Sequence, residues 1–488
     1  MMGVTERTKK IPSIWVSLIP FAVLVALIIC IIRLFGSDSL GGPSQVALII
    51  ASSVAIAIGL IFYKRQWSEI EDSITANIKG IGSALIILIL IGAIGGSWMV
   101  SGIVPTLICY GLKVISPRIF LFATCVICAL VSVMTGSSWT TIATIGVALI
   151  AIGSAMGYSE AWTAGAIISG AYFGDKISPL SDTTVLASSS AGTPLFTHIR
   201  YMMITTVPSI CISLIIFLTV SLCHPVASGS DSAALETALK GTFNISPWLL
   251  IVPVITGVMI ARKVPAMLTL LCAALMAGFT ALIAQPEIMQ GIAGAEGPMT
   301  FESGFRSLWQ SFYGSTAAST GLAEVDELVQ TGGMNGMLPT IFLIVSAATF
   351  GGSLTGCGMV ESITKSLTRR IDSRTSMVGS TVATGFMSNV ILADQYLSII
   401  LTCNIFRELY RKEGYEGRLL SRAAEDSATV TSVLIPWNSC GMTQATVLRV
   451  PTISYLPYCF FNILSPLMSV FIAAIGYKII RKKPIEEQ

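Results

Sequence analysis

Acidic side chains recur in this chain at positions flanked by long runs of apolar residues. Five of them stand out: Asp175, Asp182, Asp394, Glu425 and Asp426. An isolated carboxylate at the centre of a bilayer costs at least about 2.5 kcal/mol on insertion scales, so such groups are rare and mark functional sites. Their number predicts a site that binds cations, protons or both.

Neutral oxygen-bearing side chains accompany these acids in four short stretches. The stretches are MTGSSWTT (134–141), GDKISPLSDTTVLASSSAG (174–192), MSNVILADQY (387–396) and AAEDSATVTSVLIPWNSCG (423–441). Besides the acids, the candidate ligands are Thr135, Ser137, Ser178, Ser181, Thr183, Asn389, Ser427 and Asn438. Na⁺ is a hard cation that takes oxygen ligands, and a proton competes with it for a carboxylate. We predict that the metal ion contacts Asp182, Asp394 and Asp426.

Other interpretations of these residues stay open. The acids can pair with bases, of which Lys176 and Arg422 are the nearest in sequence, or they can lie at the membrane interface. Asp175, directly beside Lys176, is the strongest candidate for a partly neutralised structural acid. The hydroxyls of residues 134–141 can also donate hydrogen bonds to the carbonyls of their own helix.

The composition indicates what must hold these residues in place. Of the 488 residues, 53% are hydrophobic and 11% are charged, against about 25% charged in soluble domains. A helix needs about 20 apolar residues to cross the hydrocarbon core, so the runs 119–156 and 376–406 each hold more than one span. We predict an all-α polytopic membrane protein with about 11–13 transmembrane helices, some of them broken at the polar stretches.

Basic residues are placed unevenly along the chain. They cluster near both ends, in RTKK (7–10) and in 478–483, whereas the connections 222–246 and 285–338 are poorer in bases and carry several acids. The positive-inside rule therefore places both termini in the cytoplasm.

Motifs of soluble enzymes and of metal centres are absent from the sequence. It has no HExxH, GxSxG or GxxxxGK[ST] pattern, and its eleven cysteines lie mostly in apolar runs without metal-ligand spacing. Of the two histidines, His198 is expected at the membrane interface, near the end of a span. We predict no enzymatic activity, no cofactor and no nucleic-acid binding, and we expect carboxylates to carry the protons.

Two segments that lie 256 residues apart have related sequences. GGSWMVSGIVPTL begins at Gly95 and GGSLTGCGMVESI begins at Gly351, and five of the thirteen positions are identical. The first copy follows the bases Lys64 and Arg65, whereas the second follows an acidic connection and runs toward bases, which predicts opposite orientations in the membrane. Such an inverted-topology repeat is typical of secondary transporters, whose binding site lies at the midplane among broken helices.

The repeat divides the chain into five predicted parts. They are N-terminal transmembrane helices (1–69), a first inverted repeat (70–223), linking helices with an extracytoplasmic connection (224–322), a second inverted repeat (323–478) and a cytoplasmic tail (479–488).

Several long motifs resemble those of the NhaC family of sodium/proton antiporters. They are GAYFGDKISPLSDTTVLASSSAGTPLFTHIRYM (170–202), LADQYLSIILTCNIFRELYRKEG (392–414), LLSRAAEDSATVTSVLIPWNSCG (419–441) and VPTISYLPYCFFNILSPL (450–467). The resemblance covers most of the chain from about residue 70 to residue 478. It implies an ion transporter of the bacterial cytoplasmic (inner) membrane. The residues that fall on the family's motif positions are Asp175, Asp182, Thr183, Asp394, Glu425, Asp426 and Asn438.

The resemblance leaves the transported solute open. Some members of the family exchange Na⁺ or Li⁺ for H⁺, whereas others resemble antiporters of organic acids such as malate and lactate. This chain departs from the family pattern at Val185 and Ser439, and it adds Met442, Gln444 and Arg449, which can contact an organic solute.

Our main prediction is a secondary transporter that exchanges cytoplasmic Na⁺ or Li⁺ for external H⁺. The alternative is a Na⁺- or H⁺-coupled transporter or antiporter of a small organic acid or an amino acid. The expected partners are the lipid bilayer, Na⁺ and H⁺ as transiently bound ions and, in the alternative, the organic solute. A homodimer is a further candidate assembly.

Overall fold

The structure is a computed structural model of the chain, and it is almost entirely helical. It describes residues 11–35, 42–223, 229–262, 264–295, 298–317, 320, 326, 329–367, 371 and 373–481. Within these ranges there are no strands beyond two isolated bridges, Thr316–Thr331 and Tyr415–Arg481. The basic segment RTKK (7–10) and the last part of the predicted tail (482–488) lie outside the described residues.

The helices of the first half of the chain come in two groups. The N-terminal group is α1 (Ile14–Ser17), α2 (Ile19–Phe35) and α3 (Pro43–Tyr63). The second group is α4 (Trp67–Gly80), α5 (Gly82–Val100), α6 (Ile103–Val114), α7 (Phe120–Thr135), α8 (Ser138–Thr141), α9 (Val147–Ala155), α10 (Glu160–Ile177), α11 (Asp182–Ser190) and α12 (Leu195–Cys223).

The linking helices and the second half follow in the same way. The linking helices are α13 (Gly229–Thr242), α14 (Ile251–Ala261), α15 (Ala266–Ala284), α16 (Pro286–Ala293) and α17 (Phe301–Tyr313). The second half contains α19 (Leu338–Gly356), α20 (Met359–Leu367), α21 (Arg374–Leu392), α22 (Gln395–Lys412), α23 (Gly417–Ala424), the π-helical turn η6 (Glu425–Thr429), α24 (Ser439–Leu448), α25 (Thr452–Tyr455) and α26 (Phe460–Ile475).

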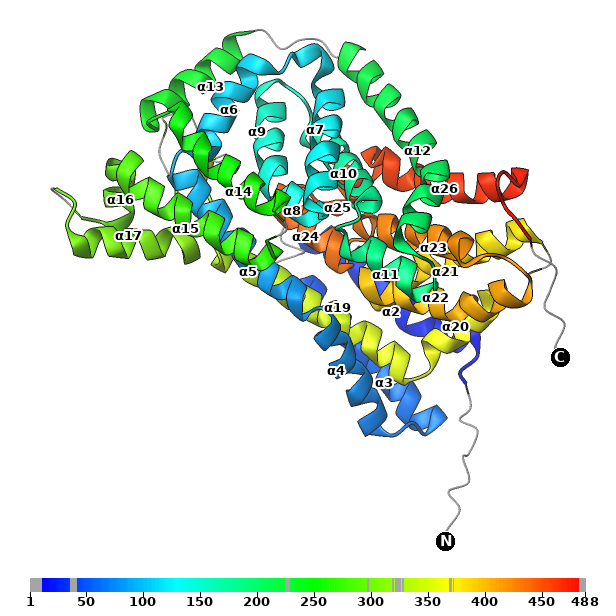
Figure 1. Cartoon of the computed structure of the whole chain (residues 1–488). Coiled ribbons are helices and arrows are strands. Elements are labelled where there is room, and N and C mark those ends of the chain that lie inside the picture. Colours follow the sequence, from blue (N-terminus) through cyan, green and yellow to red (C-terminus); the bar gives the residue numbers. More distant parts are fainter. Residues whose placement is uncertain are drawn as a thin grey trace.

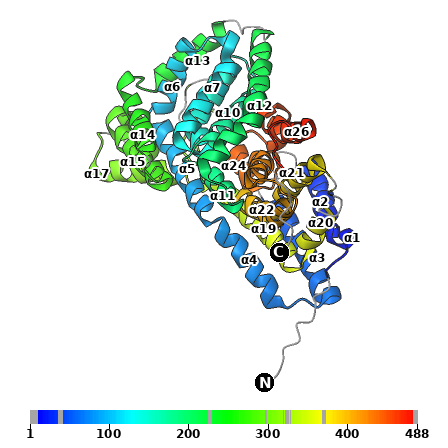
Figure 2. The same cartoon turned by 45° about the vertical axis from the view of Figure 1, so that its right-hand side comes forward.

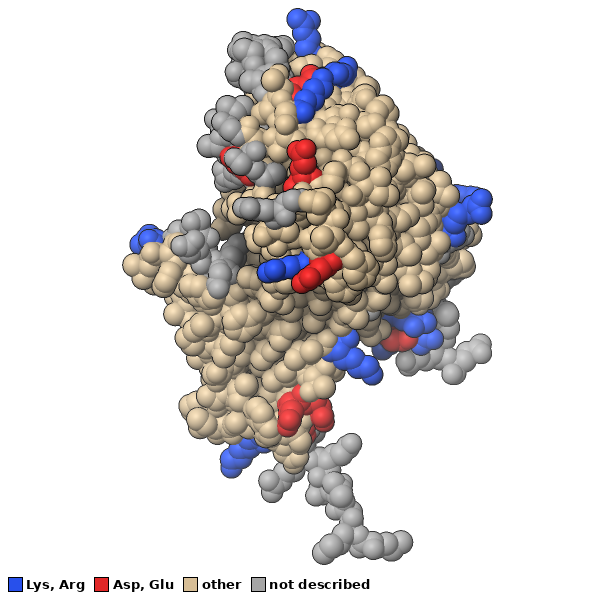
Figure 3. All heavy atoms as spheres, turned by 90° about the vertical axis from the view of Figure 1, so that its left-hand side faces the viewer, with Lys and Arg blue, Asp and Glu red and all other residues tan. Residues whose placement is uncertain are grey.

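The helices form a multi-pass membrane protein. Among the described residues, eight helices are long and apolar enough to cross a membrane, and the number is ten if each of two bent helix pairs counts as one span. These eight to ten candidates are fewer than the predicted 11–13 spans, and polar helices such as α10 and α22 are not among them. On the face shown in Figure 3, charged side chains are few and broad uncharged areas separate them, as expected of a surface in contact with lipid.

Helix starts recur in the two halves at a nearly constant spacing. The pairs of first residues are Gly82 and Leu338, Ile103 and Met359, Ser138 and Gln395, Glu160 and Gly417, Asp182 and Ser439, and Leu195 and Thr452, and each pair is 256 or 257 positions apart. The order of helices and breaks in α5–α12 is therefore repeated in α19–α26. The opposite membrane orientation of the two halves stays a prediction, as do the boundaries of the five parts.

The helices α4 and α5 follow one another as a long tilted rod with α19 beside it (Figures 1 and 2), and the two halves also meet where α10–α12 pack on α22, α23 and α26. In both views α6, α7 and α12 gather at one end of the molecule and α20–α22 lie toward the other. The largest cluster of buried apolar side chains joins α5–α10 with α14, α15 and α24. A separate cluster joins α11 with α21–α23. Because α10 and α11 belong to different clusters, the break between them lies where the two clusters meet.

Glycines allow α10 to approach α7 closely. A Cβ atom at Gly170 would lie 2.1 Å from the carbonyl oxygen of Cys125, and one at Gly174 would lie 2.4 Å from that of Ala129. Both contacts are with backbone atoms of α7, which cannot move aside as the end of a flexible side chain can. The close approach places Asp175, the next residue of α10, against the end of α7.

Gly170→Ala is expected to lower the free energy of unfolding by about 1–3 kcal/mol, because the added methyl group forces the two helix backbones apart. Thermal unfolding of the purified protein in detergent measures this loss. Gly379→Ala in α21 is the matched control, since a Cβ atom there has nothing within 4 Å. An equal loss in both variants would show that Gly170 has no special packing role.

Candidate ion-binding site

Hydroxyl groups hold the first helix break, which separates α7 from α8. Gly136 ends α7 with a φ of 66°, a left-handed conformation that glycine adopts without strain. Ser137 caps α8, and its Oγ accepts a hydrogen bond from the Thr140 amide at 3.2 Å. Thr135 Oγ1 donates to the Ser137 carbonyl at 3.1 Å. The predicted ligands Thr135 and Ser137 therefore stabilise the break itself.

Asp175 faces this break from the end of α10. Its Oδ2 accepts hydrogen bonds from the Ser138 amide at 3.2 Å and from Ser138 Oγ at 2.7 Å. Asp175 is 5% exposed, and within the described part of the chain no base lies at ion-pair distance from it. Amides at a helix start favour an ionised carboxylate. The adjacent Lys176 is engaged elsewhere, so the interpretation of Asp175 as an acid neutralised by that base does not hold.

At the second break, between α21 and α22, the acid belongs to the break itself. Ala393 has a φ of 55°, and Asp394 caps α22 by accepting a hydrogen bond from the Leu397 amide at 2.9 Å. Its other oxygen accepts a hydrogen bond from Ser439 Oγ at 3.3 Å. Asp394 is 2% exposed and has no basic partner among the described residues. Like Asp175, it is a buried carboxylate that accepts hydrogen bonds at the start of a helix that follows a left-handed residue.

Polar side chains also close the break between α10 and α11. Ser178 Oγ donates to the Val133 carbonyl at 2.8 Å, which ties the break to α7. Ser181 caps α11, and its Oγ lies 2.9 Å from Thr183 Oγ1. Thr183 Oγ1 also donates to Glu425 Oε1 at 3.4 Å. This break therefore reaches across to the second half of the chain.

Two asparagines join the corresponding elements of the second half. Asn438 caps α24, where its Oδ1 accepts a hydrogen bond from the Cys440 amide at 3.0 Å. Its Nδ2 donates to the Asn389 carbonyl at 3.1 Å. Asn389 Nδ2 donates to the Ala428 carbonyl at 2.6 Å and to Thr431 Oγ1 at 3.1 Å. Both predicted ligands thus bind the backbone that surrounds the breaks.

A buried ion pair joins α10 to η6. Lys176 Nζ donates to Asp426 Oδ1, and neither side chain is exposed. Thr205 and Ser465 donate to the same oxygen at 3.0 and 3.1 Å. Lys176 Nζ also lies 5.5 Å from the centroid of the Phe461 ring. One oxygen of Asp426, which we predicted as a metal ligand, is therefore occupied by a base and two hydroxyls, and the other has no hydrogen-bond partner among the described residues.

Beside this pair lies a second group of buried polar side chains. Arg422 Nε is 3.9 Å from Asp426 Oδ2, and the guanidinium carbon is 4.8 Å from the centroid of the Tyr201 ring. None of its three guanidinium nitrogens has a hydrogen-bond partner among the described residues. His198 Nε2 lies 3.8 Å from Glu425 Oε2. His198 is fully buried within the protein, and its predicted position at the membrane interface stays a prediction.

Two predicted ligands lie outside these contacts. Asp182 is exposed, in the first turn of α11. Ser427 is buried, but its Oγ donates to the Ala423 carbonyl of its own helix at 2.7 Å. For Ser427 the interpretation as a hydroxyl bonded to its own helix therefore fits best.

Tyr396 lies in the first turn of α22, two residues after the cap residue Asp394. Its hydroxyl is within electrostatic range of Asp175, Asp182 and Asp394. The residue keeps 36% of its surface exposed, whereas the acids at the two breaks are buried. One tyrosine of the second half is therefore within electrostatic range of acids from both halves.

The three carboxylates predicted to contact the metal ion do not form one group. Within the described ranges, no three His, Cys, Asp or Glu side chains lie close enough to hold a metal ion together. Asp426 is paired with Lys176, Asp394 caps a helix and Asp182 is exposed. The physical reason is that a buried carboxylate pairs with the nearest base in space, and sequence spacing does not reveal that base.

Buried acids outnumber buried bases in the described part of the chain. The acids are Asp175, Asp394, Glu425 and Asp426, and the bases are Lys176, Arg422 and, when it is protonated, His198. Burying an uncompensated charge is costly, so the excess acids must bind cations or protons. The cluster therefore has the capacity to take up positive charge.

Several residues that shape this cluster were not among the predicted ligands. They are Ser138, Thr205, Tyr396, Ser439 and Ser465. Ser138 and Ser439 each directly follow a predicted ligand that caps a helix, Ser137 and Asn438. Their position after a cap could have marked them as ligands of a neighbouring acid. Thr205 and Ser465 belong to apolar helices, where nothing in the sequence marks one hydroxyl above another.

Comparison with known proteins identifies the family. The sequence profile of the Na⁺/H⁺ antiporter family matches residues 2–193 and 170–477. The Na⁺/H⁺ antiporter NhaC of Alkalihalophilus pseudofirmus is 36% identical over 433 residues, which cover 88% of this chain and 90% of that protein. The malate-2H⁺/Na⁺-lactate antiporter of Bacillus subtilis is 34% identical over 454 residues, 93% of this chain and 92% of that protein.

A third similar protein is the arginine/ornithine antiporter ArcD of Halobacterium salinarum. It is 33% identical over 488 residues, which cover 98% of this chain and 95% of that protein. These matches extend over nearly the whole chain and include the broken helices that carry the buried acids. The chain therefore belongs to the Na⁺/H⁺ antiporter family.

Proposed function

We propose that the protein is a secondary antiporter that exchanges cytoplasmic Na⁺ or Li⁺ for external H⁺. The observation that carries this proposal is the pair of buried carboxylates Asp175 and Asp394, which have no base among the described residues and lie at corresponding helix breaks. Either Na⁺ or a proton neutralises such a group. Because both compete for the same oxygens, binding of one releases the other.

Asp182 has a different place in this proposal. It is exposed, and it shares the neighbourhood of Tyr396 with Asp175 and Asp394. We assign Asp182 to the accessible entrance of the site, where a carboxylate raises the local concentration of cations. Asp175 and Asp394 are then the buried ligands.

Alternating access completes the proposed mechanism. Rocking of one half against the other would expose the acids first to one side of the membrane and then to the other. The recurring helix starts support a repeat of this kind. The proposal also places both termini in the cytoplasm of a bacterium, and it requires no enzymatic step and no resident cofactor.

A second candidate is exchange of a small organic acid or an amino acid, coupled to Na⁺ or H⁺. Two of the similar proteins are a malate/lactate antiporter and an arginine/ornithine antiporter. In this chain the observation that favours such a solute is Arg422, a buried guanidinium with no hydrogen-bond partner among the described residues. A guanidinium binds a carboxylate through two parallel hydrogen bonds, so an organic acid would satisfy it.

Flux measurements in proteoliposomes separate the two candidates. With an imposed pH gradient and no organic solute present, Na⁺ is expected to collapse the gradient, because the proposed ligands need no further partner. Liposomes without protein serve as the control for leakage. If Na⁺ has no effect until malate, lactate or an amino acid is added, simple Na⁺/H⁺ exchange is wrong and the second candidate replaces it.

A further inference from the structure

A basic pocket of about 320 Å³ lies beside the first turns of α12. Its charged lining groups are Arg200 of α12, Arg418 of α23 and Lys478 of the segment after α26. Its apolar walls include Phe196 and Ile204, and no acidic side chain among the described residues lines it. Three cationic groups around one cavity create a positive potential that attracts an anion.

The three bases differ in their present partners. Arg418 contacts the carboxylate of Glu416, and both side chains are partly buried. In the described ranges no acid pairs with Arg200 or with the ammonium group of Lys478, and both residues are exposed. Two of the three cations are therefore available to a ligand.

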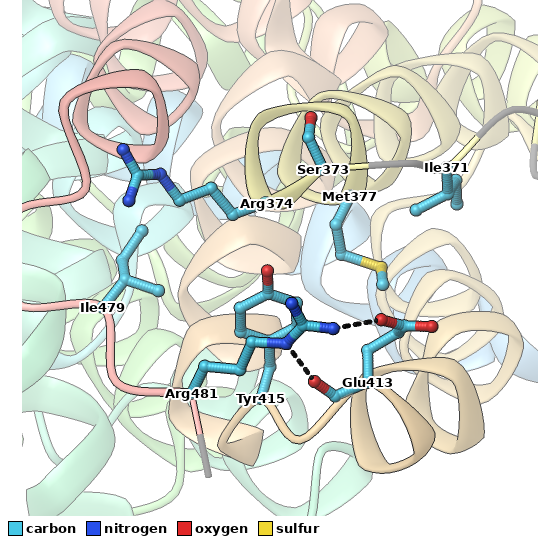
Figure 4. A pocket seen from close by; sticks show the side chains of 8 residues that line it. All are labelled: Ile371, Ser373, Arg374, Met377, Glu413, Tyr415, Ile479 and Arg481. Atoms are coloured by element: carbon cyan, nitrogen blue, oxygen red, sulfur yellow. Dashed lines mark hydrogen bonds and ion pairs between the residues drawn. The ribbon is translucent and has the colours of Figure 1, made fainter. Parts of the chain in front are cut away.

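Contacts on either side hold Lys478 at the pocket. The Tyr201 hydroxyl donates to the Lys478 carbonyl at 3.1 Å. Three residues later, Arg481 donates to the Glu413 carbonyl at 2.9 Å and to the Glu413 carboxylate at 2.7 Å, as Figure 4 shows. That neighbouring pocket holds the bases Arg374 and Arg481, but the acid Glu413 lines it and pairs with Arg481, whereas among the described residues no acid lines the pocket beside α12.

The surroundings of the basic pocket indicate its ligand. Phe196 is 72% exposed and lies at the start of a long apolar helix that carries Arg200 in its second turn. Aromatic and basic side chains together are typical of the level of the lipid headgroups. Basic clusters next to a membrane helix are typical of sites for anionic lipids. We propose that this basic pocket binds the phosphate group of an anionic phospholipid from the adjacent leaflet.

Tyr201 connects the basic pocket with the buried ion pair. The guanidinium carbons of Arg418 and Arg422 both lie 4.8 Å from the centroid of its ring. Arg422 in turn lies 3.9 Å from Asp426, the partner of Lys176. A phosphate bound in the pocket would attract Arg418. Because Arg418 and Arg422 contact the same Tyr201 ring, a shift of Arg418 would also change the packing of Arg422. Lipid binding is expected to stabilise the protein against heating.

Binding of lipids to the purified full-length protein tests this proposal. Native mass spectrometry gives the dissociation constants of phosphatidylglycerol and phosphatidylcholine. We expect phosphatidylglycerol to bind more tightly, because the choline group of the other lipid neutralises its phosphate. The double variant Arg200→Gln/Lys478→Gln is expected to bind phosphatidylglycerol about twenty-five-fold more weakly, from about fivefold for each base removed.

Two further variants control for folding. Arg411→Gln removes an exposed base that pairs with Glu408 and does not line the pocket, so it should bind phosphatidylglycerol as the wild type does. Lys478→Arg keeps the charge and should keep the affinity. Unchanged affinity in the double variant, or equal affinity for phosphatidylcholine, would overturn the proposal.

Inorganic phosphate at millimolar concentration distinguishes a lipid from a soluble anion. We expect it to leave the melting temperature unchanged, whereas phosphatidylglycerol should raise it. If phosphate alone stabilises the protein as much as the lipid does, the pocket binds a soluble anion and the assignment to a lipid is wrong.

Discussion

Asp175→Asn is expected to lower Na⁺-driven proton exchange in proteoliposomes about a hundredfold or more. Asparagine keeps the shape of the side chain and still accepts the hydrogen bonds of Ser138, but it carries no charge and binds no proton. A Na⁺ bound at this buried position would lose its counter-charge, and removing one partner of such a pair costs about 3–5 kcal/mol. Each 1.36 kcal/mol is about tenfold in rate or affinity. Asp394→Asn should have a similar effect, because Asp394 occupies the corresponding break.

Variants of two other carboxylates serve as comparisons for the exchange rate of Asp175→Asn. Glu160→Gln changes an exposed acid at the opposite end of α10 and should leave the exchange rate unchanged. Asp182→Asn should raise the Na⁺ concentration needed for half-maximal flux while some exchange remains, as expected of a residue at the entrance. Normal exchange with normal Na⁺ affinity in Asp175→Asn would remove Asp175 from the site.

Asp426→Asn is expected to lower the free energy of unfolding by about 3–5 kcal/mol, because it leaves the ammonium group of Lys176 buried without its counter-charge. Unfolding of the purified protein in mixed micelles measures this loss. The double variant Lys176→Met/Asp426→Asn should recover most of the stability, since it removes both charges of the pair together.

An exposed ion pair provides the comparison. Arg411→Gln breaks the pair between Arg411 and Glu408, whose side chains are 71% and 62% exposed, and should cost at most about 1 kcal/mol. If Asp426→Asn were as stable as Arg411→Gln, the buried pair would not hold α10 to η6. If the double variant were less stable than Asp426→Asn, Lys176 would have a stabilising role that does not depend on Asp426.

The roles of Asp175 and Asp182 show where reasoning from sequence was insufficient. Their neighbours suggested that Asp182 with its threonines is the stronger ligand and that Asp175 pairs with Lys176. Successive residues of a helix point about 100° apart, so adjacent side chains meet different partners. In the structure Asp175 meets Ser138, whereas Lys176 meets Asp426.

Local composition was sufficient to predict the membrane helices, their breaks and the acids near them. The length of an apolar run, a glycine such as Gly136 and a charge such as Asp394 are properties of a few consecutive residues, and the cost of burying them in a bilayer follows directly. The two related segments at Gly95 and Gly351 likewise pointed to two similar halves, and the helix starts recur at the same spacing.

The packing of the helices decided which of those acids are neutralised. Lys176 and Asp426 are 250 positions apart, and Thr205 and Ser465 come from two further helices. Whether a buried carboxylate keeps its charge for a transported ion depends on the bases that reach it through space. For that reason, among the residues that the structure describes, Asp175 and Asp394 have no base at ion-pair distance, whereas Asp426 has Lys176.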